Sequence, residues 1–276
     1  MNLKDVDIVE KFDDASFRQI YLEKGIPCVL KDRSKHWPAL SKWNEDYLAE
    51  KLGEAEIGFS DAGFSEPGKN YMSTTKKMNF AEYLEQVKLG TNSLRVFAYN
   101  IKYYCKDLGA DIKTLNIDMK ISEFFCFLFV GSKGGETQFH YDIDMTHIFH
   151  TVIKGNKTFY LYDKSMSHNL YSHPYTVRSY VDVVNPDYDK YPRMKALEGY
   201  KVVLEPGDTL FIPTGYWHQV VYHEYSVAVS HRSRNESKLV FMEGVFNLFI
   251  MQLFDRFMNK LLGDSWFRYK ERESFK

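Results

Sequence analysis

The sequence predicts a mainly β protein in which an antiparallel β core lies between an α/β lead-in and C-terminal helices. Helical and strand patterns alternate in the lead-in, and a wide apolar face at helical spacing follows Ser237. The length of 276 residues predicts one to two domains. We divide the chain into three segments: the lead-in, residues 1–120; the core, residues 121–236; and the C-terminal helical segment, residues 237–276. The core is predicted by short strand-like segments separated by turn residues: EFFCFLFVG, GGETQFHYD, THIFHTVIKGNKTFYLYD, YKVVLEPGDTLFIP and HQVVYHEYSVAVSHR.

The sequence of the lead-in predicts three helices and two strands. Apolar residues at three- and four-residue steps predict helices over residues 14–23, 43–51 and 79–89. Short apolar runs predict strands over residues 26–32 and 93–101, the second with the sequence SLRVFAYNI. We expect these elements to pack on the β core.

A long segment, residues 163–199, interrupts the strand pattern of the core. It is too long for a turn, and ordered loops of this length are often functional. Its tyrosines would either form a rim for an extended peptide or pack the segment onto the core; they are Tyr171, Tyr175, Tyr180, Tyr188 and Tyr191.

Charge and cysteine content limit the function classes. Lys plus Arg (36) nearly equals Asp plus Glu (37), so no global field favours nucleic acid or anionic lipid. Three scattered cysteines do not form a disulfide framework or a paired-cysteine zinc site. The acidic start MNLKDVDIVEKFDD is unlike a secretory signal, and the longest apolar run, FFCFLFV, is too short to span a membrane. We therefore expect a cytoplasmic protein.

The stretch QFHYDIDMTHIFH, residues 138–150, carries the most chemistry. Residues two apart in a strand face the same side, so His140 and Asp142 project together. His218, in EPGDTLFIPTGYWHQV, is the best candidate for a third ligand. Two histidines and one carboxylate on one face of a metal, with open positions opposite, are typical of non-haem iron oxygenases. Asp144 has the same parity as Asp142 and stays an alternative ligand.

The motifs FHYD, IKGNKTFYLYD, VNPDYDKYP and LEPGDTLFIPTGYWHQV, taken in this order, resemble the Jumonji-C (cupin-like) 2-oxoglutarate oxygenases. The resemblance covers roughly residues 15–235 and is greatest to the subgroup of the asparaginyl hydroxylase of hypoxia-inducible factor. It implies a double-stranded β-helix (jelly-roll) core. It also implies Fe(II), 2-oxoglutarate as cosubstrate, and dioxygen.

By position, the resemblance implies that His140, Asp142 and His218 are the metal ligands and the catalytic residues. It implies that Lys157, in GNKTF, pairs with the distal carboxylate of 2-oxoglutarate. It also implies that the hydroxyl of Thr137 helps to bind the same carboxylate. A buried ammonium needs an anionic partner, which agrees with the role of Lys157.

Three positions depart from the subgroup pattern, so the cosubstrate pocket is expected to differ in detail. Phe97, with Tyr99 on the same face, stands where the subgroup has a tyrosine that contacts the cosubstrate. His147 and Ser230 stand where the subgroup has asparagines. We expect His147 to line the pocket and His150 to be structural.

The resemblance implies hydroxylation of a C–H bond, with a protein side chain as the expected substrate. An RNA base or a small molecule is an alternative, and hydroxylation next to nitrogen would give demethylation. A catalytically silent cupin-like binding protein is the main rival, and a zinc or manganese enzyme on the same barrel is another.

The C-terminal segment predicts an oligomer. In the resembling hydroxylase such helices form the homodimer, so we expect a two-fold dimer through residues 238–262. The alternative is that this apolar face packs on its own chain. The last residues, RYKERESFK, are expected to be a mobile charged tail.

Overall fold

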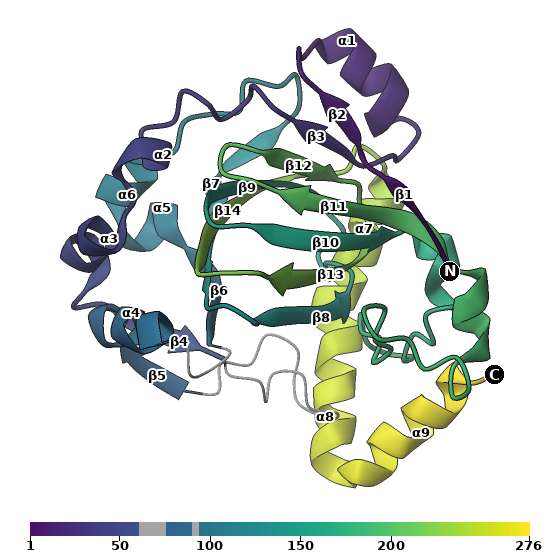
Figure 1. The fold of residues 1–276 in the computed structure, drawn as a ribbon. Helices are drawn as coiled ribbons and strands as arrows, with labels where there is room; N and C mark the ends of the chain where they lie inside the picture. Colours follow the sequence, from purple (N-terminus) through teal and green to yellow (C-terminus); the bar gives the residue numbers. More distant parts are fainter. Residues whose placement is uncertain (61–75, 90–93) are drawn as a thin grey trace.

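Two β-sheets face each other and form the core (Figure 1). The computed structural model describes residues 1–60, 76–89 and 94–276. In the five-stranded sheet the order is β1 (Asn2–Asp5), β11 (Glu198–Leu204), β10 (Lys157–Tyr162), β13 (Trp217–Tyr222) and β8 (Glu136–His140). In the seven-stranded sheet it is β2 (Asp7–Val9), β3 (Cys28–Leu30), β12 (Thr209–Ile212), β9 (His147–Lys154), β14 (Ser226–Ser233), β7 (Ile121–Gly131) and β6 (Arg95–Asn100). The predicted mainly β, jelly-roll core is confirmed.

The interior between the two sheets is apolar except at one site. Phe159 and Leu161 of β10 point into this interior, whereas Tyr160 and Tyr162 belong to a second cluster outside the sheet. Because β10 is buried on both faces, its sequence KTFYLY does not show the simple alternation of a half-exposed strand.

The lead-in packs helices on the outer side of the seven-stranded sheet, as Figure 1 shows. The predicted helices and strands of this region are present, with shorter bounds than the sequence indicated. The segments are α1 (Asp14–Phe17) with η1 (Arg18–Leu22), α2 (Ala39–Lys42), α3 (Glu45–Leu52), the hairpin β4 (Glu56–Phe59) and β5 (Lys76–Asn79), α4 (Phe80–Leu89), α5 (Ile101–Tyr104) and α6 (Lys106–Asp111).

The N-terminal strands β1 and β2 were not predicted. Each pairs in parallel with a strand distant in sequence, β1 with β11 and β2 with β3. Their residues are mostly exposed, so neither has the apolar pattern that identifies a strand from sequence.

The excursion between β10 and β11 is packed on the core and on the C-terminal helices. It holds only the short 3₁₀ segments η3 (Lys164–Ser167) and η4 (Pro192–Ala196). The ring of Tyr175 stacks on Trp266, and the ring of Tyr180 meets Phe267 edge-on. Of the two roles expected for these tyrosines, the structure therefore favours packing.

The C-terminal segment is helical as far as Ser274. It comprises α7 (Lys238–Phe246), η5 (Asn247–Met251), α8 (Gln252–Leu262) and α9 (Asp264–Ser274). Gly263 has a positive φ of 50° and allows the turn from α8 into α9. The expectation of a mobile charged tail was wrong, because α9 contains most of it and Phe275 packs its ring on Tyr171 and Tyr191.

Among the described residues, no helix has both the length and the apolar character needed to cross a membrane.

Candidate metal centre

His140, Asp142 and His218 meet at one end of the barrel interior. His140 ends β8, Asp142 follows two residues later, and His218 lies on β13 as the register partner of His140. One candidate ligand atom from each of the three lies within 4.8 Å of the others. All three side chains are buried. The structure thus brings together the three residues that the sequence singled out.

Hydrogen bonds orient both imidazoles. Nδ1 of His140 lies 2.7 Å from the carbonyl oxygen of Gln138, and Nδ1 of His218 lies 3.0 Å from that of Tyr216. A neutral ring that donates from Nδ1 carries its lone pair on Nε2, which is the form that binds a metal. Burial lowers the pKa of His218 to about 4 and holds that of His140 well below its usual value. Both rings are therefore neutral at pH 7.

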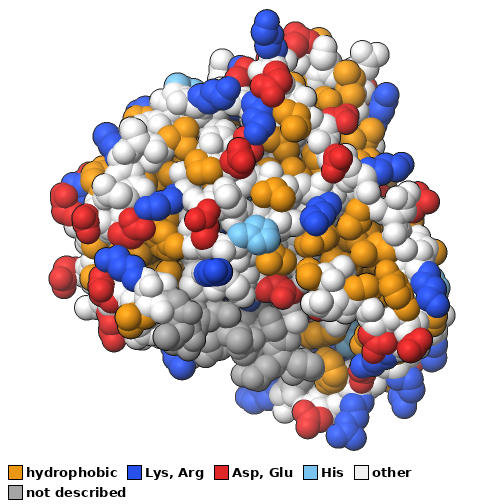
Figure 2. Space-filling model, in the orientation of Figure 1, with side chains coloured by type: hydrophobic (Ala, Val, Ile, Leu, Met, Phe, Trp, Pro, Cys, Tyr) orange, Lys and Arg blue, Asp and Glu red, His pale blue; other side chains and the backbone are white. Residues whose placement is uncertain are grey.

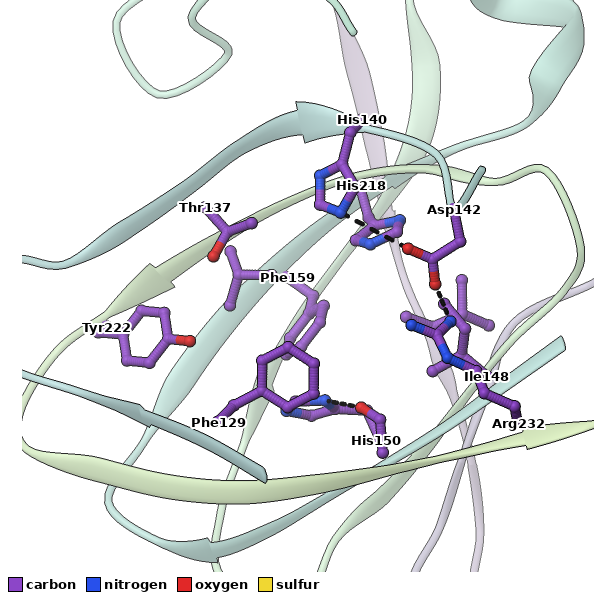
Figure 3. A pocket seen from close by; sticks show the side chains of 13 residues that line it. Phe129, Thr137, His140, Asp142, Ile148, His150, Phe159, His218, Tyr222 and Arg232 are labelled. Atoms are coloured by element: carbon purple, nitrogen blue, oxygen red, sulfur yellow. Dashed lines mark hydrogen bonds and ion pairs between the residues drawn. The ribbon is translucent and has the colours of Figure 1, made fainter. Parts of the chain in front are cut away.

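Asp142 presents its two carboxylate oxygens in different directions (Figure 3). Oδ1 lies 3.7 Å from Nε2 of His140, and Oδ2 forms an ion pair with Nη1 of Arg232. Sequence reasoning did not identify Arg232. The ion pair fixes the rotation of the carboxylate and leaves Oδ1 directed at the imidazoles.

The far end of the same cavity is formed by Thr137 and Tyr222, as Figure 3 shows. Lys157 is fully buried at this end, and its Nζ lies 4.4 Å from the centroid of the Tyr222 ring. In the part of the chain that the structure describes, Nζ has no hydrogen-bond partner. Burial lowers the pKa of this ammonium to about 7. An unpaired buried cation is costly, so this end of the cavity is suited to an anion.

The expected roles of His147 and His150 are reversed in the structure. His150 lines the cavity, and its Nδ1 lies 2.7 Å from the hydroxyl of Ser230, another lining residue. His147 instead lies at the start of β9, where it accepts a hydrogen bond from the backbone N–H of Thr214. The strand register decides this, because His150 and Ser230 are direct partners across β9 and β14.

The remaining sequence candidates lie away from this cavity. Asp144 is not part of the His140 cluster, and its carboxylate accepts hydrogen bonds from the backbone N–H and the hydroxyl of Thr146. The ring of Tyr99 packs at a tilt against that of Tyr104 and does not line the cavity. The side chain of Phe97 lies outside the described residues.

A second, larger cavity of about 480 Å³ adjoins the first. Asp142 and Arg232 line both cavities, so the second one opens onto the candidate ligands. Its wall is mainly apolar and includes residues of β7, α7 and η5, among them Phe125, Phe127, Phe241, Val245 and Leu248.

A barrel of this architecture, with two imidazoles and one carboxylate converging in its interior, defines a class of cupin proteins that can hold a metal. Residues 14–234 match the family model described as "Cupin-like domain", which covers well over half of the chain. The chain therefore belongs to the cupin-like JmjC family. This family uses Fe(II), 2-oxoglutarate and dioxygen.

Similar proteins come from several kingdoms. The "Lysine-specific demethylase JMJ30" of Arabidopsis thaliana is 29% identical over 239 residues, which are 80% of this chain and 53% of that protein. The "JmjC domain-containing protein D" of Dictyostelium discoideum is 30% identical, over 74% of this chain and 50% of that protein. The "tRNA wybutosine-synthesizing protein 5" of Gallus gallus is 28% identical, over 77% of this chain and 71% of that protein. The chain thus spans about half the length of the first two relatives.

Proposed function

We propose that this protein is an Fe(II)- and 2-oxoglutarate-dependent hydroxylase. The observation that carries the proposal is a cluster of two neutral imidazoles and a carboxylate at one end of a buried cavity, with Lys157 buried against the Tyr222 ring at the other end. Among the described residues, the Lys157 ammonium has no hydrogen-bond partner. Metal ligands alone would suit many metalloproteins. The added buried cation is what a dicarboxylate cosubstrate requires.

The donor set fits ferrous iron. Nε2 of His140, Nε2 of His218 and Oδ1 of Asp142 would bind one face of the ion and leave the opposite positions open. The backbone carbonyls that accept from both Nδ1 atoms, and the Arg232 guanidinium on Oδ2, would hold these donors in place.

The cavity also fits 2-oxoglutarate. Lys157 would bind its distal carboxylate, and the Thr137 hydroxyl would donate a hydrogen bond to the same group. Phe129, Ile148 and Phe159 line the path between the two ends and would exclude water from it. When bound, iron, the 2-oxo acid and dioxygen would supply oxidation of a substrate C–H bond coupled to decarboxylation of the acid to succinate.

A protein side chain is the proposed substrate. The second cavity opens onto Asp142, and its volume of about 480 Å³ and apolar wall suit one inserted side chain. Whether hydroxylation ends the reaction or releases formaldehyde depends on the substrate carbon, because a carbinol attached to nitrogen breaks down.

An RNA base is the second candidate. One observation favours it: the match to the "tRNA wybutosine-synthesizing protein 5" covers a larger share of the relative, 71%, than the match to the "Lysine-specific demethylase JMJ30", 53%. The rings of Phe125, Phe127 and Phe241 in the second cavity would then stack on the base.

Succinate release with peptide and tRNA pools would separate these candidates. We expect peptides to raise succinate formation above the uncoupled rate and to gain 16 mass units, or to lose methyl groups. Stimulation by tRNA alone would replace the peptide proposal with the RNA candidate. Absence of any 2-oxoglutarate turnover, with iron present, would contradict the hydroxylase proposal and favour a silent binding protein.

We also propose that the protein is a homodimer through α7, η5 and α8. One side of this helical segment packs on the chain, where Gly244 lies so close to the Asp144 carbonyl that a Cβ would sit 2.3 Å from it. The other side leaves large apolar residues exposed, and Figure 2 shows hydrophobic side chains gathered on the side of the molecule where Figure 1 places the excursion and the C-terminal helices. The residues of this segment that are more than half exposed are Leu239, Met242, Phe246, Phe249, Ile250, Leu253, Phe257 and Leu261.

Light scattering after gel filtration tests the dimer. Phe249→Glu and Phe257→Glu together are expected to give a folded monomer, because both rings are more than half exposed in the single chain. Leu89→Glu, at another exposed apolar position on α4, is the matched control and should not change the mass. A wild-type protein that elutes as a monomer would contradict the proposal.

A further inference from the structure

A third buried imidazole faces the cavity that holds the candidate ligands. His150 lies on β9 of the seven-stranded sheet and lines this cavity. Figure 3 shows it across the cavity from His140. The residue is only 6% exposed, and its ring meets the rings of Phe129 and Phe159 at centroid distances of 5.6 and 5.0 Å. These two aromatic rings hold the imidazole in place.

Only one of the two ring nitrogens of His150 has a hydrogen-bond partner among the described residues. Nδ1 lies 2.7 Å from the hydroxyl oxygen of Ser230, whereas Nε2 is buried and has no partner. A buried polar atom without a partner costs free energy, so a bound group that supplies a partner is favoured. Because His150 lines the cavity, that group can be a molecule bound in it.

The protonation of His150 determines what it can bind. Burial, and then the nearby charge of Lys157, hold the pKa of His150 well below its usual value, so the ring is neutral at pH 7. A neutral imidazole carries its proton on one nitrogen only. If the Ser230 hydroxyl donates to Nδ1, the proton lies on Nε2. A carboxylate only accepts hydrogen bonds, so a bound carboxylate selects this form of the ring.

We propose that His150 is a further binding residue for the 2-oxo acid, and that its Nε2–H donates a hydrogen bond to a carboxylate oxygen of the acid. Ser230 is then a positioning residue, because its hydroxyl holds the ring in the donor form. This inference rests on the proposed function. The sequence assigned the contacts of the acid to Lys157 and Thr137, which both lie on the five-stranded sheet. His150 adds a donor from the opposite sheet, so the acid is held from both sides.

Calorimetric titration of the Mn(II)-loaded protein with 2-oxoglutarate tests the role of His150 without turnover. His150→Leu is expected to weaken binding of the acid by about tenfold or more, because a hydrogen bond to a charged group is lost. The affinity for Mn(II) itself should not change. His150→Gln places an amide N–H near the position of Nε2 and should restore most of the affinity for the acid. His147→Leu is the matched control, since His147 is a buried histidine of the same strand that does not line the cavity.

Nuclear magnetic resonance of the histidine-labelled, Zn(II)-loaded protein separates a binding role from a structural one. Addition of 2-oxoglutarate to the wild type should place the proton of His150 on Nε2 and slow its exchange with water. Ser230→Ala should reduce the population of this form and weaken binding of the acid several-fold. A residue that only fills space would change neither. The measurement on the wild type decides the question even if His150→Leu does not fold.

The two proposals fail in different ways. If the wild type binds 2-oxoglutarate and His150→Leu binds it equally well, the role of His150 is overturned and the hydroxylase proposal stays intact. A His150 proton that remains on Nδ1 with the acid bound would have the same meaning. A Mn(II)-loaded wild type that does not bind 2-oxoglutarate would contradict the proposed function, and the role of His150 with it.

Discussion

At the scale of single residues, the candidate centre depends on small differences in position. Asp142 and Asp144 have the same strand parity, yet only Asp142 has an oxygen near both imidazoles. Asp144 lies within the turn from Asp142 to Met145, and its carboxylate accepts hydrogen bonds from Thr146. Asp142 is therefore a candidate ligand and Asp144 is not, so Asp144 can serve as a control for substitutions at Asp142.

Removing the Asp142 carboxylate should abolish metal binding. We expect Asp142→Ala to weaken Mn(II) binding by more than about a hundredfold, because one of three ligands is lost. Asp144→Ala is the matched control and should bind the ion as the wild type does. Calorimetric titration of both variants measures this, and equal loss in the two would contradict the assignment of Asp142.

Lys157 should make the stability of the metal-free protein depend on pH. Its pKa is about 7 in the folded protein and 10.5 in the unfolded chain, so between these values the unfolded chain binds more protons. Stability therefore rises with pH through this window, and the cost of the buried charge is greatest below pH 7. Lys157→Met should be more stable than the wild type at pH 6, and the difference should shrink by about 3 kcal/mol at pH 9.

Urea unfolding at the two pH values checks the prediction for Lys157. Lys154→Met removes a partly exposed ammonium that pairs with Glu45. The difference in free energy of unfolding between this variant and the wild type should be about the same at the two pH values. A Lys157→Met variant with the same pH slope as the wild type would show that the ammonium is not buried as described.

At the scale of elements, α9 is held to α8 by one carboxylate. Oδ1 of Asp255 accepts a hydrogen bond of 2.7 Å from the Trp266 indole and pairs with the Lys270 ammonium at 2.6 Å. The Lys270 side chain is only 4% exposed, so its charge depends on this partner.

Asp255→Ala should release α9 from the excursion. Leaving the Lys270 ammonium buried and unpaired is expected to cost about 2–4 kcal/mol, which should appear as faster amide exchange over residues 264–274. Glu273→Ala, which removes an exposed pair with Lys276, should change exchange little. Unchanged protection in Asp255→Ala would show that the ring contacts alone hold the helix.

Sequence patterns predicted the elements that are determined locally. The spacing of apolar residues and the turn residues between segments predict the strands that carry His140 and His218, and also the helices of the lead-in. The reversal of His147 and His150 could not be predicted, because it depends on the register of β9 against β14, set by residues about 80 positions away. Arg232 was missed for a similar reason, because its ion pair with Asp142 joins residues 90 positions apart in the sequence.

At the scale of the whole molecule, the fold places two adjoining cavities beside the C-terminal helices. The two sheets enclose the cavity that holds the candidate metal ligands, and Lys157 is buried against the Tyr222 ring at its other end. A larger cavity adjoins the first one at Asp142 and Arg232. The C-terminal helices contribute to the wall of the larger cavity through Phe241, Val245 and Leu248. The proposed dimerisation on the opposite side of these helices would therefore also hold the wall of the larger cavity in place.

Anaerobic titration of the metal-free protein with Fe(II) and then 2-oxoglutarate tests the central claim most directly, because it needs no substrate. We predict a weak visible charge-transfer band that requires both components and is absent in His218→Ala. Admission of oxygen should bleach the band and yield succinate. If iron binds and the acid does not, the assignment of the Lys157 end of the cavity is contradicted; if iron does not bind, the assignment of His140, Asp142 and His218 as a ferrous site is contradicted.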